Sequence, residues 1–119
     1  MEDAQGQTVS DFDVFDERCP SRGALLDVTG RWGALTLLAL ARGATRFGEV
    51  HRMIGGSSER MLAQTLRSLE ADGLVNRGGA ARGPSAGYVL TGPGREVAAR
   101  VEGLVDALYG ALAVALPQH

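Results

Sequence analysis

The side chains best suited to recognition chemistry lie along one predicted helix, in the stretch SSERMLAQTLRSLEADGLVNR at residues 57–77. Leucines at helical spacing, assisted by Met61, form one apolar stripe, and the residues that point away from this stripe are Glu59, Arg60, Ala63, Gln64 and Arg67. Arginine pairs in bidentate fashion with guanine O6 and N7, and glutamine pairs in the same way with adenine N6 and N7. The polar face therefore predicts hydrogen bonds to base edges in the major groove of DNA, which small Ala63 allows the helix to approach.

An ordinary solvated face is the alternative interpretation, and for an isolated amphipathic helix it is the favoured one. The residues that follow the helix reverse this preference. Arg77 and Arg82 lie in or beside a glycine-rich loop, from which their side chains can reach phosphates or the minor groove. No acid occurs between residues 75 and 95, and Glu59 is the only acid expected on the recognition surface.

Both ends of the same helix carry residues typical of helix termini. Ser57 or Ser58 is expected to be the N-cap, and the exposed backbone amides at this end are suited to binding a phosphate. Gly73 stands where a left-handed residue ends a helix, and Leu74 can fold back on the last turn in a Schellman-type closure. The helix is therefore expected to have fixed limits.

A preceding helix and a following hairpin are predicted to flank this surface. A short amphipathic helix with Thr45 as a possible N-cap is expected over residues 45–54, before a turn at glycines 55 and 56. Short strands at residues 74–75 and 88–90 enclose NRGGAARGPSAG, whose glycines and proline predict no regular structure. This order predicts a mostly α fold with a small β-hairpin wing, the winged helix-turn-helix.

Three further helices are expected outside the pair. The first begins at Pro20 or Ser21 and stops at Gly30, and the second, RWGALTLLALARG at residues 31–43, is apolar nearly all round and forms the central core helix. A last helix over about residues 92–116, capped by Thr91, follows a 3.6-residue period through Val97, Val101, Leu104, Val105, Leu108 and Leu112. Glycines within this helix lower its stability relative to alanine, and close contact with another backbone is one way to compensate for that loss.

Charge is segregated along the 119-residue chain, although its net charge is only -2. Residues 1–17 carry six acids and no base, whereas residues 18–95 carry eleven arginines and five acids. A basic body of this kind favours a nucleic-acid partner. We therefore expect an acidic, disordered tail at residues 1–17 and one domain at residues 18–116.

The sequence argues against an enzyme and against a membrane protein. Its two histidines have no spacing typical of a metal site, the glycine motifs of nucleotide loops are absent, and no catalytic residue, metal or other cofactor is expected. The first residues lack the apolar segment of a secretory signal, and charges interrupt the only long apolar stretch. With a single cysteine, Cys19, these features predict a cytoplasmic protein.

Four stretches of the chain resemble the HxlR-type winged helix-turn-helix transcription regulators, relatives of the MarR class. The matching stretches are CPSRGALLDVTGRW, RFGEV, SERMLAQTLRSLEADGLVNR and YVLTGPGRE, which cover about residues 19–96. The resemblance implies a bacterial homodimer joined by its N- and C-terminal helices, with a recognition helix from each copy on a pseudo-palindromic double-stranded DNA operator. It places Arg46 and Arg52 beside the first helix of the pair and counts both among the DNA-binding residues. Gly92 precedes Pro93 where the family usually has proline alone.

The resemblance leaves the signal and the partner class open. Cys19 matches a cysteine with which several family members sense oxidants or electrophiles, and a small apolar ligand between the core and the dimer helices is the other possible effector. We expect a repressor controlled by one of these signals, with the dimer held by residues 97–112 of the last helix. The alternative function is a protein-binding module that has lost sequence-specific DNA binding.

Overall fold

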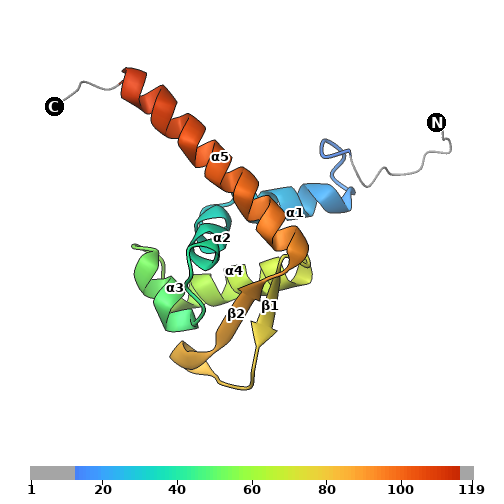
Figure 1. Cartoon of the computed structure of the whole chain (residues 1–119). Coiled ribbons are helices and arrows are strands. Elements are labelled where there is room, and N and C mark those ends of the chain that lie inside the picture. The colour runs from blue at the N-terminus through green and yellow to red at the C-terminus, as the bar shows by residue number, and fades with distance from the viewer. Residues whose placement is uncertain (1–12, 116–119) are drawn as a thin grey trace.

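The computed structural model describes residues 13–115 of the chain, with side chains up to residue 113. Within this part the element order is α1 (Pro20–Thr29), α2 (Gly33–Ala41), α3 (Phe47–Met53), α4 (Glu59–Ala71), β1 (Val75–Gly78), the 3-10 turn η1 (Gly83–Ser85), β2 (Gly87–Leu90) and α5 (Gly92–Ala115) (Figure 1). The predicted fold class is confirmed: α3, its turn and α4 form the helix pair, and β1 and β2 form the wing.

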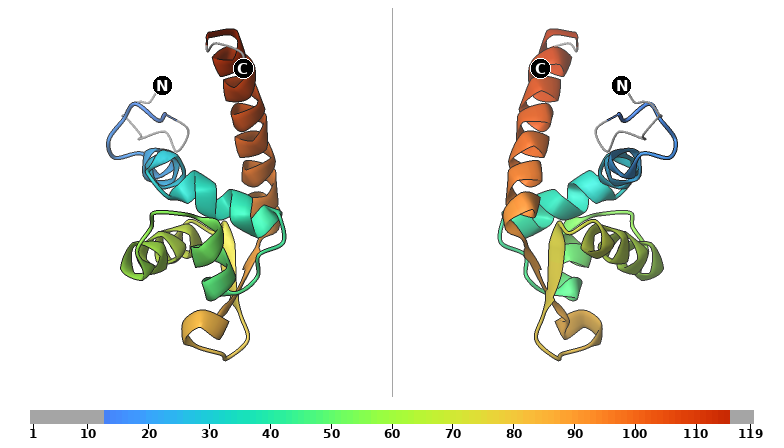
Figure 2. Two further views of the ribbon diagram at one scale, coloured as in Figure 1. Left: turned by 90° about the vertical axis from the view of Figure 1, so that its left-hand side faces the viewer. Right: turned by 90° about the vertical axis from the view of Figure 1, so that its right-hand side faces the viewer.

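Helix α2 is the centre of the core, as its apolar sequence predicted. It contacts α1, α3, α4, α5 and β2. The core side chains with at most 1% of their surface exposed include Leu37, Val50, Leu62, Leu66 and Leu69. The core therefore lies where the helix pair, α2 and the wing meet, and it fixes the direction in which α4 faces (Figure 2).

The hydrogen bonds at both ends of α4 confirm the predicted termini. The Ser58 hydroxyl accepts a hydrogen bond from the Met61 amide at 3.1 Å. Gly73 has φ +79, and the amides of Gly73 and Leu74 donate to the carbonyls of Glu70 and Leu69, both at 3.0 Å. These two bonds are the Schellman closure, which only a residue free to adopt positive φ accommodates without strain.

The wing is more ordered than its composition predicted. Strands β1 and β2 pair antiparallel with Val75 opposite Leu90 and Arg77 opposite Tyr88. The loop between them contains η1, so the expectation of no regular structure in this segment was wrong. The segment before α3 also joins the hairpin, because the Tyr88 amide donates to the Thr45 carbonyl at 2.9 Å.

Two local predictions need correction. Arg46 and not Thr45 is the N-cap of α3, and the Glu49 carboxylate accepts from both backbone amides, each at 2.9 Å. Met61 is 43% exposed and lies outside the buried stripe of α4. Within the expected acidic tail, residues 13–17 form hydrogen-bonded turns, and residues 1–12 lie outside the described residues.

Helix α5 begins as predicted and then extends away from the rest of the chain (Figures 1 and 2). The Thr91 hydroxyl accepts a hydrogen bond from the Gly94 amide at 2.9 Å. Glu102 forms two hydrogen bonds with Arg42 at the end of α2, at 3.0 and 2.9 Å, and this pair fixes α5 against the core. No single described helix is long and apolar enough to cross a membrane, although α1 and α2, bent by 73° at their junction, meet the length and composition test together.

Asp72, at the C-cap of α4, is unfavourable to the fold at neutral pH. Its Oδ2 atom is buried and has no hydrogen-bond partner in residues 13–113. Burial of the carboxyl, reinforced by the adjacent Asp27 of α1, raises the pKa of Asp72 from 3.8 to about 6. Between these two pH values the folded state binds more protons than the unfolded state, so stability falls as the pH rises through this window.

We expect Asp72→Asn to stabilise the protein at neutral pH. The substitution removes the buried charge, and because Asp72 is only partly buried, solvent screening limits the gain in free energy of unfolding to about 1 kcal/mol at pH 7.5. At pH 4 the gain should nearly vanish, since the folded wild-type carboxyl is then protonated. Urea unfolding at both pH values checks this, with Asp106→Asn on exposed α5 as the control. An equal gain at both pH values would contradict the assignment.

Candidate nucleic-acid interface

The outward face of α4 and the wing together line a basic hollow. Its volume is about 420 Å³, and Arg60, Ala63 and Arg67 of α4 lie on one side of it with Arg77 of β1 on the other. Burial of Leu62, Leu66 and Leu69 on the opposite side of the helix leaves Arg60 and Arg67 exposed. The structure thus brings together four of the residues that the sequence singled out, from two elements.

Arg77 is held toward this hollow by an aromatic ring. Its guanidinium carbon lies 5.8 Å from the centroid of the Tyr88 ring, directly across the β1–β2 ladder. Such a cation–π contact orients the charged group without neutralising it. Tyr88 is buried and lines the same hollow, and sequence reasoning had read it only as a strand residue.

Two acids also lie on this surface, one more than the sequence predicted. Glu59 and Glu70 both line the hollow, so the expectation that Glu59 would be the only acid there was wrong. Glu70 stands one residue after the leucine that closes the apolar stripe, and only the position of the wing reveals that it faces the hollow. A third nearby acid, Glu49, is exposed between α3 and the wing loop, and hydrogen bonds from the Thr45 and Arg46 amides lower its pKa.

Gln64 lies apart from the arginines. It is exposed on α4 but lines a separate hollow with Met61, Thr65 and the turn between α1 and α2. Helical spacing predicted only that Gln64 faces away from the buried leucines. The structure adds that Gln64 and Arg67 flank the exposed edge of α4 on different sides, so they would meet different parts of a bound duplex.

Arg46 and Arg52 line a second hollow of about 430 Å³, between α3 and the wing loop. Arg82 is exposed immediately before η1. Ser57 and Ser58 lie at the start of α4, where the Ser57 hydroxyl donates to the Ile54 carbonyl at 3.3 Å and the Ser58 hydroxyl caps the helix. The predicted basic residues therefore surround the helix pair and the wing.

His51 connects the two helices of the pair, a role that sequence reasoning missed. Its Nε2 atom lies 2.9 Å from the Ser57 carbonyl, and because a carbonyl only accepts, the ring nitrogen must donate. The His51 ring also stacks on Phe47, with centroids 6.4 Å apart. No local sequence pattern reports a contact between residues six positions apart.

Cys19 lies far from the basic hollows, at the start of α1. It is 3% exposed, and its Sγ atom is 3.2 Å from the Ser21 hydroxyl. Burial raises the pKa of the thiol, but hydrogen bonds from Ser21 and from the backbone of Arg22 outweigh burial, so its pKa is lowered. The Arg18 side chain nearby is paired with Asp16 at 3.3 Å.

Comparison with known proteins decides the family. Residues 27–112 match the HxlR-like helix-turn-helix family, which covers both helices of the pair, the wing and most of α5. The chain belongs to the HxlR-like helix-turn-helix family.

Relatives of this HxlR-like chain are transcriptional regulators. The HTH-type transcriptional regulator YtfH of Escherichia coli (strain K12) is 46% identical over 101 residues, which is 84% of this chain and 80% of the relative. The structure of the transcriptional regulator YtfH from Salmonella typhimurium has a TM-score of 0.75 at 44% identity, covering 85% of this chain and 91% of that one. The redox regulator HypR in its reduced form has a TM-score of 0.62 at 32% identity, covering 73% and 87%.

The family and the structure together establish the general function. The HxlR-like chain is a transcriptional regulator with a helix-turn-helix DNA-binding domain, as the sequence predicted, and its family and relatives are not enzymes. The basic hollow lies beside the outward face of α4, the second helix of the pair, and in this motif the second helix is the one that enters the major groove.

We expect Arg67→Ala to weaken binding to the specific DNA site by about 10- to 100-fold, because Arg67 is exposed on the outward face of α4 and a bidentate base contact is worth about 1–3 kcal/mol. Arg100→Ala removes the same charge from exposed α5 and is the matched control. Fluorescence anisotropy measures affinity for both variants. Equal affinities would remove Arg67 from the site, and light scattering should show unchanged assembly.

Proposed function

We propose that this HxlR-like protein binds a pseudo-palindromic DNA operator as a homodimer and represses transcription. We also propose that the protein is cytoplasmic. The observation that carries the proposal is the hollow in which two arginines of α4 face Arg77 across a gap. A helix in the major groove with basic residues beside it is the usual docking geometry of this motif. Arg52 and Arg82 extend the positive surface toward the flanking phosphates.

The exposed face of α5 supports a second copy of the chain as the dimer partner. Leu104, Leu108 and Leu112 are 53%, 50% and 49% exposed, and Tyr109 beside them is 68% exposed. A Cβ atom added at Gly103 would lie more than 4 Å from any atom beyond the adjacent turns of α5. Soluble monomers rarely leave such a continuous apolar face uncovered.

The proposed dimer face is narrower than the sequence predicted. Val101 is only 6% exposed and Val97 packs against the core of its own chain, so both have their partners within the protomer. Val105 is partly buried at the boundary between the two regions. The interface residues are accordingly the exposed leucines and Tyr109 in the half of α5 that extends from the body.

The proposal predicts that Leu108→Glu yields monomers and loses tight DNA binding, because a charge would be buried in the apolar contact and each copy would then hold only one half-site. Light scattering measures the mass, and anisotropy against DNA from the upstream region of the protein's own gene measures affinity.

Wild-type affinity should fall by orders of magnitude between 50 and 200 mM salt if about six or more phosphates are contacted. A variant that stays dimeric refutes this interface, and salt-insensitive wild-type binding favours the protein-binding alternative.

Two signals remain candidates for controlling the regulator. The lowered pKa of Cys19 supports thiol chemistry, and the resemblance to the redox regulator HypR agrees with it. A hollow of about 370 Å³ between α2, β2 and α5 supports a small apolar ligand, since Leu40, Tyr88 and Ala98 lie among its lining residues. The two signals act at different places, Cys19 at the start of α1 and the ligand at the base of α5.

Oxidation by diamide tests the first signal. Two Cys19 thiols from different chains would form one disulfide, with their two protons and two electrons passing to diamide. We expect diamide to lower the DNA affinity of the wild type at least tenfold and to leave the affinity of Cys19→Ser unchanged. The oxidised wild type should run as a covalent dimer on a non-reducing gel. An equal loss of DNA affinity in both proteins, or no loss in either, would refute the redox signal. The small apolar ligand would then be the remaining candidate.

A further inference from the structure

The loop of the wing is fastened to the first helix of the pair. Besides the bond from Tyr88 to Thr45, the Phe47 amide donates to the Ala86 carbonyl at 2.8 Å, and Arg46 forms a β-bridge with Gly87. The segment before α3 therefore acts as a short third strand along β2. Movement of the wing relative to α3 would break these backbone bonds.

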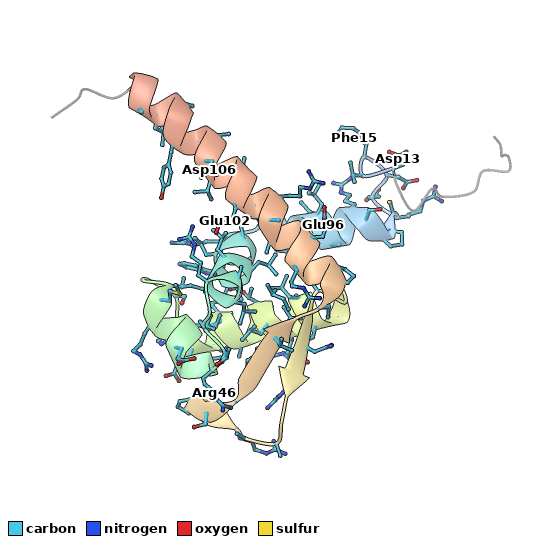
Figure 3. The ribbon with its side chains drawn as sticks, in the orientation of Figure 1. Asp13, Phe15, Arg46, Glu96, Glu102 and Asp106 are labelled. Atoms are coloured by element: carbon cyan, nitrogen blue, oxygen red, sulfur yellow. The ribbon has the colours of Figure 1, made fainter. Side chains whose placement is uncertain are left out.

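Arg46 adds a side-chain connection at the same junction. Its Nη1 atom donates to the Ser85 carbonyl at 3.1 Å, so the guanidinium reaches the last residue of η1 (Figure 3). Arg46 and Ser85 are 39 residues apart in the chain. The Ala86 amide in turn donates to the Gly83 carbonyl at 3.0 Å, which closes the 3-10 turn directly after Arg82.

Gly48 allows the loop to lie this close to α3. A Cβ atom at this position would be 3.3 Å from both Cβ and the carbonyl oxygen of Pro84 in η1. Such a separation is tighter than ordinary van der Waals contact, so a larger side chain would push η1 away. Gly48 and Arg46 thus hold the same turn from two sides, one by leaving space and the other by a hydrogen bond.

We infer that Arg46 is a positioning residue, which sets the wing loop so that Arg82 meets the DNA, and is not itself one of the DNA-contacting residues. This inference rests on the proposed function. The guanidinium of Arg46 is directed at its own chain, whereas Arg82 is exposed at the start of η1 and has no hydrogen bond or ion pair among the described residues. The effect of Arg46 on DNA binding must then depend on the presence of Arg82.

The first test uses the free protein and needs no DNA. Arg46→Met keeps the length of the side chain but removes its donors, and loss of one hydrogen bond of about 1 kcal/mol should speed amide exchange at Ala86 and Gly87 about fivefold. Arg52→Met, which loses the same charge in the same hollow, is the matched control and should leave these amides unchanged. Unchanged exchange in Arg46→Met would overturn the inference.

The second test is a double-mutant cycle measured by anisotropy at one salt concentration. Arg46→Met should weaken DNA binding about fivefold in the wild-type background and have no effect in the Arg82→Met background. The control Arg52→Met should weaken binding equally in both backgrounds. Additive losses for Arg46 and Arg82 would show that Arg46 contacts DNA directly and would overturn the inference.

A charge-neutral variant separates positioning from loss of charge. Gly48→Val should displace η1 and reproduce both results of Arg46→Met, faster exchange and a loss of affinity that depends on Arg82. Normal affinity in Gly48→Val with displaced wing amides would overturn the link between loop position and DNA binding. If the wild-type protein binds no DNA, the proposed function fails while the exchange experiment still tests the wing junction.

Discussion

Burial of three leucines along one side of α4 is the constraint on which the recognition surface depends. Leu62, Leu66 and Leu69 have at most 1% of their surface exposed, and each contributes about 1.5–3 kcal/mol of burial. Any rotation of α4 that moved its arginines inward would expose these leucines and bury charge. The apolar contact therefore determines where Arg60 and Arg67 point, although neither arginine takes part in it.

A second constraint fixes the wing and α5 relative to that helix. The Schellman closure at Gly73 directs the chain into β1, and the Thr91 hydroxyl donates to the Gly73 carbonyl at 2.7 Å, which ties the start of α5 to the end of α4. The Arg42–Glu102 pair then sets the course of α5 over α2. The helix pair, the wing and the first half of α5 consequently form one unit with few independent parts.

The sequence predicted what depends on near neighbours. The leucine period, the Ser58 cap, the glycine-terminated end of α4 and the Thr91 cap all involve residues within five positions of one another, and each was confirmed. The partner of Arg46 and the Arg42–Glu102 pair depend on residues 39 and 60 positions apart, which periodicity does not report. Glu70 belongs to the same group, because its place in the hollow between α4 and the wing is visible only once the wing is folded beside α4.

These contacts limit how a signal could act in the proposed dimer. Helix α4 is held by the core on one side and by closures at both ends, so a change at Cys19 or in the hollow beside α5 has little scope to rotate it within its own chain. Both candidate sites instead adjoin the helices that carry exposed apolar residues, α1 with Leu25 and Leu26 and α5 with Leu108. A shift of one whole unit against its partner changes the separation of the two recognition helices, and DNA fixes that separation at one helical turn. In the proposed dimer, a signal that changes the separation of the two recognition helices therefore disturbs the fold of each chain least.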